Sequence, residues 1–201
     1  MRLCGRTGKP ATRKLVICGD GATGKTTLLN VFTRGYFPQV YEPTVFENYV
    51  QEVVVDGQEV ELSLWDTAGQ EEFDRLRSLS YAETHAVIMC FSVDSRDSLD
   101  NIPNRWMNEI VEHCPDAKIL LVALKCDLRD NEELLRRKNI TPVLYEEGLE
   151  VARSINAVRY LECSAKHNRG IRECFDQAAR VSLNVKLKQT GDAKRSTCHI
   201  L

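Results

Sequence analysis

The run from Gly19 to Thr26 has the residue types and spacing that bind a polyphosphate. It reads Gly-Asp-Gly-Ala-Thr-Gly-Lys-Thr and fits the pattern G-x-x-x-x-G-K-[ST]. Glycines let backbone N–H groups turn toward phosphate oxygens, and the positive end of a following helix adds to the attraction. Lys25 would bring charge to the β- and γ-phosphates, and Thr26 would offer its hydroxyl to Mg²⁺. The alternative is a glycine-rich turn that only caps a helix.

A second stretch places a carboxylate where a metal beside that loop would need one. The segment Leu64 to Gln70 reads Leu-Trp-Asp-Thr-Ala-Gly-Gln, and Asp66 ends an apolar, strand-like run. Carboxylate and hydroxyl oxygens are the ligands that Mg²⁺ prefers. The two motifs together predict a site for a nucleoside triphosphate and its metal.

These motifs resemble those of the Ras superfamily of small GTPases. The segment from Tyr41 to Tyr49, with the charged stretch after Asp127, is similar to the Rho family, and most to a fungal Rho subgroup associated with polarised growth and secretion. The resemblance covers about Lys14 to Arg180 and also the last four residues. It implies a P-loop GTPase domain whose sheet has six mostly parallel strands with one antiparallel hairpin strand.

The resemblance also assigns roles to single residues. Thr44 would complete the Mg²⁺ shell with Thr26 and Asp66, and Gly69 would bind the γ-phosphate through its N–H. Gln70 would be the catalytic residue that orients the attacking water, and Phe37 and Tyr41 would lie over the ribose and phosphates. The residues expected to contact the nucleotide are Gly19, Asp20, Gly21, Ala22, Thr23, Gly24, Lys25, Thr26, Thr27, Phe37, Tyr41, Thr44, Asp66, Gly69, Lys125, Asp127, Ser164, Ala165 and Lys166.

Base selection is expected from two loops. Asp127, in Leu-Lys-Cys-Asp, can accept hydrogen bonds from both N1–H and the exocyclic amine of guanine, a pair that adenine does not offer. The Ala165 N–H would reach guanine O6. The family usually has Asn or Thr where Leu124 stands, so one polar contact is expected to be missing. That departure is expected to affect the affinity for nucleotide more than the selectivity for guanine.

The elements that must position these residues follow from the apolar pattern. Strands are predicted at Leu15–Cys18, Ala86–Phe91 and Ile119–Leu124, and a hairpin at Val45–Val55 and Glu59–Trp65 around Asp56-Gly57. Helices are predicted at Lys25–Phe32, Ser98–His113, Asn131–Lys138, Tyr145–Ile155 and Ile171–Lys188. This alternation predicts a three-layer α/β sandwich. Trp106 and Met107 are interpreted as packing residues.

Length, charge and cysteines limit the remaining options. The 201 residues suit one domain, and a net charge of -2 gives no bulk attraction to nucleic acid. No apolar run reaches the roughly 20 residues that span a bilayer, and the first residues lack the apolar core of a secretory signal. We therefore expect an intracellular protein. The 8 cysteines lack paired spacing and are expected to be reduced, several of them in the core.

The two ends are expected to be tails around the GTPase domain of residues 14–187, which carries the charged Rho-type insert at about 130–142. Residues 1–13 form a basic tail, and 188–201 end in Cys-His-Ile-Leu, a prenylation signal at Cys198 that favours geranylgeranyl. One prenyl group gives weak residence, so S-palmitoylation of Cys4 is proposed as a second anchor. The alternative is a free Cys4 thiol. The expected location is the cytoplasmic face of the plasma membrane, with a cytosolic pool.

The expected function is a GTP/GDP switch that hydrolyses GTP slowly alone and faster with an activating protein. GTP and Mg²⁺ would order residues 36–46 (switch I) and 67–81 (switch II). The expected partners are an exchange factor, an activating protein, a dissociation inhibitor and effectors of polarity, actin organisation and exocytosis, and we expect a monomer. One alternative is a GTP-bound scaffold that hydrolyses poorly. Another is a nucleotide kinase.

Overall fold

The computed structural model describes residues 10–40 and 43–186. Its strands form one sheet in the order β2-β3-β1-β4-β5-β6, in which only β2 and β3 pair antiparallel. The strands are β1 Ala11–Gly19, β2 Phe46–Val55, β3 Gln58–Thr67, β4 Ala86–Ser92, β5 Lys118–Leu124 and β6 Arg159–Glu162. The α-helices are α1 Lys25–Arg34, α2 Asp74–Ser78, α3 Arg96–Asn101, α4 Met107–His113, α5 Glu132–Lys138, α6 Tyr145–Ser154 and α7 Ile171–Leu183. Short 3₁₀ turns η1 Glu71–Phe73 and η3 Cys126–Asp130 and the π-helical turn η2 Ile102–Trp106 complete the elements.

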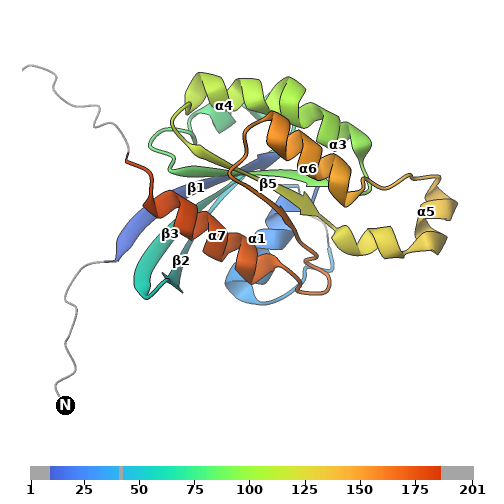
Figure 1. Cartoon of the computed structure of the whole chain (residues 1–201), viewed down its shortest axis with the longest axis horizontal. Coiled ribbons are helices and arrows are strands. Elements are labelled where there is room, and N and C mark those ends of the chain that lie inside the picture. Colours follow the sequence, from blue (N-terminus) through green and yellow to red (C-terminus); the bar gives the residue numbers. More distant parts are fainter. Residues whose placement is uncertain (1–9, 41–42, 187–201) are drawn as a thin grey trace, which may run out of the picture.

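Helices cover the sheet on two sides, which confirms the predicted three-layer α/β sandwich. Figure 1 shows α3, α4 and α6 above the sheet, and α1 and α7 below it. Strands β4 and β5 are buried along most of their length, as their continuous apolar runs predict. The parallel strands end on the same side of the molecule, so the loops that follow them share one edge.

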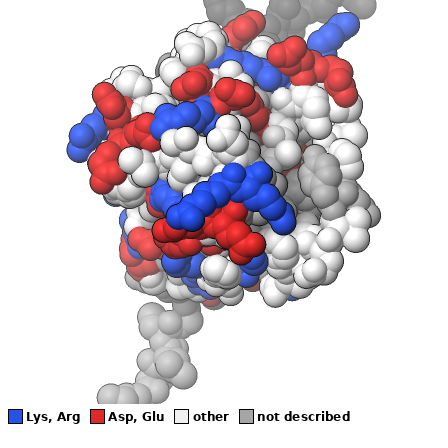
Figure 2. All heavy atoms as spheres, turned by 90° about the vertical axis from the view of Figure 1, so that its right-hand side faces the viewer, with Lys and Arg blue, Asp and Glu red and all other residues white. Residues whose placement is uncertain are grey.

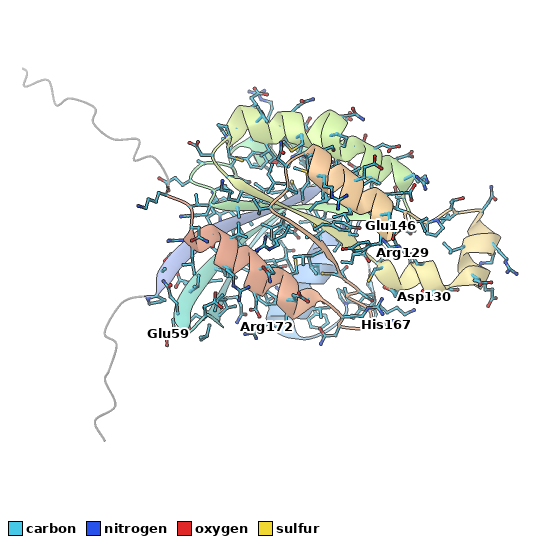
Figure 3. The ribbon with its side chains drawn as sticks, in the orientation of Figure 1. Glu59, Arg129, Asp130, Glu146, His167 and Arg172 are labelled. Atoms are coloured by element: carbon cyan, nitrogen blue, oxygen red, sulfur yellow. The ribbon has the colours of Figure 1, made fainter. Side chains whose placement is uncertain are left out.

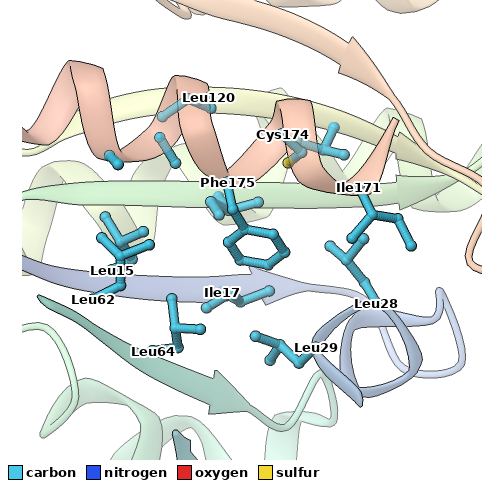
Figure 4. Packing of buried hydrophobic residues seen from close by; sticks show 14 of the residues in the cluster. Leu15, Ile17, Leu28, Leu29, Leu62, Leu64, Leu120, Ile171, Cys174 and Phe175 are labelled. Atoms are coloured by element: carbon cyan, nitrogen blue, oxygen red, sulfur yellow. The ribbon is translucent and has the colours of Figure 1, made fainter. Parts of the chain in front are cut away.

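The core below the sheet forms around one aromatic side chain of α7. Phe175 lies among Ile17 of β1 and Leu28 and Leu29 of α1 (Figure 4), and its ring stacks on that of Phe32 at 3.8 Å. The face of α7 predicted to be apolar is buried at Ile171, Cys174, Phe175 and Ala178. This packing fixes α1 against β1, and α1 begins where the phosphate loop ends.

The hairpin predicted around Asp56-Gly57 is confirmed. Both residues have positive φ, 52° and 77°, as a two-residue hairpin turn requires. Along β3, Val60, Leu62 and Leu64 are buried while the residues between them are partly exposed. The register carries Asp66 and Thr67 to the same edge as the end of β1.

Three predicted boundaries were wrong. β1 begins at Ala11, so the last three residues assigned to the basic tail belong to the sheet, where Ala11 pairs with Val60 of β3. The helix predicted at Ser98–His113 begins two residues earlier, at Arg96, and is interrupted by η2, because Pro103 has no N–H and its ring clashes with the preceding turn. Helix α7 ends at Leu183 and not at Lys188.

The cysteines and the surface charges of the described residues agree with the sequence pattern. Their six cysteines are unpaired and buried, as predicted, and no helix within these ranges is long and apolar enough to cross a membrane. Basic and acidic side chains lie interspersed on the face that Figure 2 shows. Tyr41, Cys4 and Cys198 lie outside the described residues.

Candidate nucleotide-binding site

The loop between β1 and α1 has a backbone that only glycine tolerates at its two ends. Gly19 has φ +132° and Gly24 has φ +106°, both in the left-handed region. A Cβ on Gly19 would lie 2.1 Å from the carbonyl oxygen of Cys90. The glycine spacing seen in the sequence is therefore required by φ and by close approach to β4.

Lys25 is held in place by this loop. Its side chain is buried, and Nζ donates to the carbonyl oxygens of Gly19 at 2.7 Å and Asp20 at 2.8 Å. Burial lowers the pKa of its ammonium group below the ordinary value, and the Asp66 carboxylate opposes that shift. A buried ammonium bonded only to neutral carbonyl groups would gain strongly from an anion.

Three oxygen-bearing side chains meet beside Lys25. The Thr26 hydroxyl donates to Asp66 Oδ2 at 2.6 Å and is hydrogen-bonded to the Thr44 hydroxyl. They come from α1, β3 and the segment before β2, which are far apart in the sequence. The structure thus brings together the three residues predicted to hold a metal.

The environment of Asp66 suits a ligand of a cation. Burial raises the pKa of its carboxyl group to about 6, against the lowering effects of the Thr26 hydrogen bond and the Lys25 charge. Its second oxygen, Oδ1, is buried without a hydrogen-bond partner. Two hydroxyl groups and a carboxylate with one unpaired oxygen are ligands of the kind that Mg²⁺ prefers. The described residues contain no His, Cys, Asp and Glu cluster for another metal site.

The segment after β3 closes onto the phosphate loop. A Cβ on Gly69 would lie 2.2 Å from the Gly21 nitrogen, so no larger residue fits there. The Gln70 side chain lies over Gly21, because a Cβ on Gly21 would be 3.7 Å from its Nε2. Gln70 Oε1 is buried and has no hydrogen-bond partner. Its amide therefore retains free hydrogen-bonding capacity at the loop.

Two adjoining pockets lie along this edge and share Gly24, Thr27 and Lys125. The first has a volume of about 550 Å³ and the second about 180 Å³. Of the residues predicted to contact nucleotide, the first pocket is lined by Gly21, Ala22, Gly24, Lys25, Thr26, Thr27, Thr44, Gly69 and Lys125, and the predicted catalytic residue Gln70 lines it too. The second is lined by Gly24, Thr27, Phe37, Lys125, Asp127, Ala165 and Lys166.

The second pocket has a carboxylate in a mostly apolar wall. Asp127 Oδ1 accepts a hydrogen bond from the buried Ser164 hydroxyl at 2.6 Å, which fixes the carboxylate orientation. Leu124 forms part of the wall, and its side chain is buried against Gly24 of the phosphate loop. A small, largely apolar pocket with one oriented acceptor group suits a purine base.

An ion pair behind this pocket supports the Asp127 loop. Arg129 donates two hydrogen bonds to Glu162, at 2.6 and 2.7 Å, and one to the Val143 carbonyl oxygen. Figure 3 places Arg129 right of centre, near Asp130. Burial alone would raise the Glu162 pKa, but hydrogen bonds from Arg129 and Tyr160 outweigh it and lower this pKa.

Glu162→Gln should lower the free energy of unfolding by about 1–3 kcal/mol, because Arg129 loses a charged partner in a partly buried setting. Folding lowers the Glu162 pKa, so the ionised carboxylate stabilises the folded protein at any pH above the ordinary glutamate pKa. This stabilisation is lost as the pH falls through the pKa that Glu162 has in the folded protein. Urea unfolding at neutral and acidic pH would measure this. A difference between variant and wild type that stays constant down to acidic pH would contradict the account.

Some predicted residues lie behind the pockets and not in them. Gly19, Asp20, Thr23, Asp66 and Ser164 line neither pocket, although backbone or side-chain hydrogen bonds connect each to a lining residue or its neighbour. The Asp20 carboxylate binds Asn101 and Trp106 instead. Trp106 is buried, as its interpretation as a packing residue predicts, and Met107 packs against the same core.

Sequence reasoning missed Arg77, which supports the site through backbone carbonyls, and Arg129, which is held by Glu162 behind the second pocket. Arg77 donates to the carbonyl oxygens of Ala68 and Gln70, at 2.8 and 3.3 Å. No spacing in the sequence signals such contacts, because each depends on how distant elements pack.

Comparison with known proteins gives a consistent result. The Ras family matches residues 14–184 of this chain. The chain is 55% identical to "GTP-binding protein RHO3" of Eremothecium gossypii over all of both chains. It is 61% identical to "GTP-binding protein rho3" of Schizosaccharomyces pombe, covering 94% of this chain and 91% of the relative. It is 55% identical to "GTP-binding protein RHO1" of Candida albicans, covering 94% and 96%.

Proposed function

Because the chain belongs to the Ras family and to its Rho-type small GTPases, we propose that it is a molecular switch that signals in the GTP-bound state. It binds GTP, hydrolyses it to GDP and phosphate, and thereby ends the signal. This function accounts for a nucleotide site whose closing segment also carries the catalytic glutamine.

The strongest support for this function is the close approach of Gly69 and Gln70 to the phosphate loop. The loop alone is shared by nucleotide kinases, but those enzymes need a second substrate site and a lid. Here the space over Gly21 is occupied by the Gln70 side chain, whose Oε1 has no protein partner. That amide can hold a water molecule in line with the terminal phosphate.

Catalysis then consists of positioning and charge stabilisation by this chain's residues. Lys25 stabilises negative charge on the β- and γ-phosphates, and the Gly69 N–H donates to the γ-phosphate. Gln70 orients the attacking water. An activating protein would add an arginine, which is the usual source of the remaining acceleration.

Thr26, Thr44 and Asp66 would hold Mg²⁺, which neutralises phosphate charge when bound. The hydrogen bond between Thr26 and Thr44 also suggests how nucleotide state reaches the partner surface. Thr44 belongs to switch I, so Thr44 would hold switch I against α1 when it contributes to the metal site. Effectors would bind this ordered surface.

Base recognition is assigned to Asp127 and the loop at Ala165, and a lipid tail to Cys198. By relation to the Rho3 and Rho1 proteins, we propose roles in cell polarity, actin organisation and exocytosis at the plasma membrane. The regulators would be an exchange factor, an activating protein and a dissociation inhibitor.

Single-turnover phosphate release from GTP-loaded protein tests the proposal. Slow release alone and rapid release with a Rho-type activating protein is the expected result. Release that no activating protein accelerates would favour the hydrolysis-poor scaffold. Transfer of phosphate from GTP to a nucleoside monophosphate would favour the kinase.

Gly21→Val should lower activated hydrolysis by about 10²-fold or more, because the added methyl groups would displace Gln70 from contact range. GTP binding should persist, since the loop backbone at Gly21 needs no positive φ. Single-turnover release with an activating protein measures the effect. Gly57→Val is not a suitable control, because Gly57 has positive φ, but Ala82→Val adds bulk at an exposed position that has no positive φ and lines neither pocket. Equal activated rates for Gly21→Val and wild type would contradict this assignment.

Cys198→Ser should remove the protein from membranes, whereas Cys4→Ser should leave it prenylated but more easily extracted. The reason is that one lipid gives weak residence and the basic N-terminal tail brings Cys4 to an anionic surface. Membrane fractionation and a hydroxylamine-sensitive acyl label measure both. Equal retention of Cys4→Ser and wild type, with no such label on the wild type, would exclude the acyl group.

A further inference from the structure

A chain of side-chain contacts connects the phosphate loop to switch II outside the nucleotide pocket. At one end the Asp20 carboxylate accepts hydrogen bonds from Asn101 Nδ2 at 2.7 Å and Trp106 Nε1 at 2.8 Å. Trp106 is fully buried, and the guanidinium of Arg77 lies 4.7 Å from its ring centroid. At the other end Arg77 donates to the carbonyl oxygens of Ala68 and Gln70.

The π-helical turn η2 makes the first of these connections possible. In an α-helix two residues five positions apart point about 140° away from each other. The wider π turn, in which the Met107 N–H bonds to the Ile102 carbonyl oxygen, brings such residues onto nearly one face. Asn101 and Trp106 are five apart, and both reach Asp20. The interruption of the helix thus has a structural use at the phosphate loop.

Arg77 is buried and is held in one position by its hydrogen bonds. It is 2% exposed, and Glu109 accepts two hydrogen bonds from it, at 2.6 and 2.8 Å. Burial alone would lower its pKa, but Glu109 and Asp74 raise it, so the guanidinium stays charged. Nε and Nη2 bind Glu109 while Nη1 reaches the carbonyl oxygens on both sides of Gly69, a combination of contacts that the single ammonium group of lysine could not reproduce.

We propose that Arg77 and Trp106 are positioning residues for hydrolysis, which hold the Gly69-Gln70 backbone and the phosphate loop at Asp20 in one arrangement. The proposal rests on the proposed function, in which Gln70 orients water. It adds that the position of Gln70 is set from outside the pocket, through the ring of Trp106. Neither residue lines either pocket, so both would act on hydrolysis through the residues that they hold.

The test measures single-turnover hydrolysis without an activating protein, together with the rate of GDP release, in Arg77→Lys, Trp106→Phe and the double variant. Arg77→Lys keeps the charge and loses the fork, and Trp106→Phe keeps the ring and loses the N–H. Each should slow hydrolysis about tenfold, because displacement of a positioned group by a fraction of an ångström is enough. GDP release should change less than about twofold, since the pocket contacts remain.

Two matched variants separate positioning from general destabilisation. Arg105→Lys removes a guanidinium that lies at the same 4.7 Å from the Trp106 ring but bonds no switch II carbonyl. Trp65→Phe repeats the tryptophan change where Nε1 bonds only the Ser63 hydroxyl. Both should hydrolyse GTP at nearly the wild-type rate. The double variant should be no slower than the slower single one, because both changes break one connection.

Fluorescence gives a readout independent of hydrolysis. The chain has 2 tryptophans, so Trp65→Phe leaves Trp106 as the reporter. Exchange of GDP for a non-hydrolysable GTP analogue should change its emission, and Arg77→Lys should remove most of that change. Three results would each overturn the proposal. The effects of the two changes could multiply in the double variant, or Arg77→Lys could hydrolyse GTP at the rate of Arg105→Lys. The third is an emission change that Arg77→Lys leaves unaffected. If Gln70→Leu hydrolysed normally while the emission result held, the assignment of Gln70 would fail and the connection would stand.

Discussion

Gln70→Leu should lose most of the hydrolysis that an activating protein induces and keep its affinity for GTP. The side chain orients water and holds no part of the nucleotide, and leucine has similar bulk without a hydrogen-bonding group. In Ras, activation is worth about 10⁵-fold, so the loss can approach that factor. The measurement is single-turnover phosphate release with saturating activating protein, beside equilibrium binding of a fluorescent GTP analogue.

Gln58→Leu is the matched control for this change. Gln58 is exposed at the start of β3, at the opposite end of the strand from Asp66 and Thr67. It should be activated like the wild type. An activated rate for Gln70→Leu close to that of Gln58→Leu would show that Gln70 does not orient the water.

Asp127→Asn should change base preference from guanine toward xanthine. The carboxylate accepts from N1–H and the exocyclic amine of guanine, whereas an amide can donate to the carbonyl that xanthine has in place of the amine. Loss of these contacts in a mostly apolar slot should weaken GTP binding by about 10²- to 10³-fold and improve XTP binding. Competition against a fluorescent nucleotide measures both affinities.

Asp130→Asn makes the same change three residues further along η3, at an exposed position labelled in Figure 3. Its GTP and XTP affinities should match those of the wild type. Unchanged base preference in Asp127→Asn would assign base reading to another group, and the Ala165 loop would be the next to test.

Local motifs made much of this molecule predictable. The phosphate loop is continuous in the sequence, and its backbone conformation requires its glycines. Residue type and spacing are therefore enough to predict the loop. The turn at Asp56-Gly57 and the apolar face of α7 are local in the same sense.

Long-range packing determined what could not be predicted. Ala11 joins the sheet because β3 offers it a partner, although its own segment is basic and polar. The break at Pro103 takes the form of a π turn from which Asn101 and Trp106 both reach Asp20, which lies 81 and 86 positions earlier in the chain. Arg77 lies in a charged segment of switch II, yet its side chain is buried against Trp106 and Glu109. Such roles depend on contacts between elements tens of residues apart.

Hydrogen exchange of the full-length protein, compared between GDP and a non-hydrolysable GTP analogue, tests the central claim most directly. The account predicts slower amide exchange within residues 36–46 and 67–81 in the analogue-bound state, because Thr44 and Gly69 are then held at the γ-phosphate. Exchange in β4, β5 and α7 should be unchanged. Equal protection of both segments in the two nucleotide states would contradict a switch.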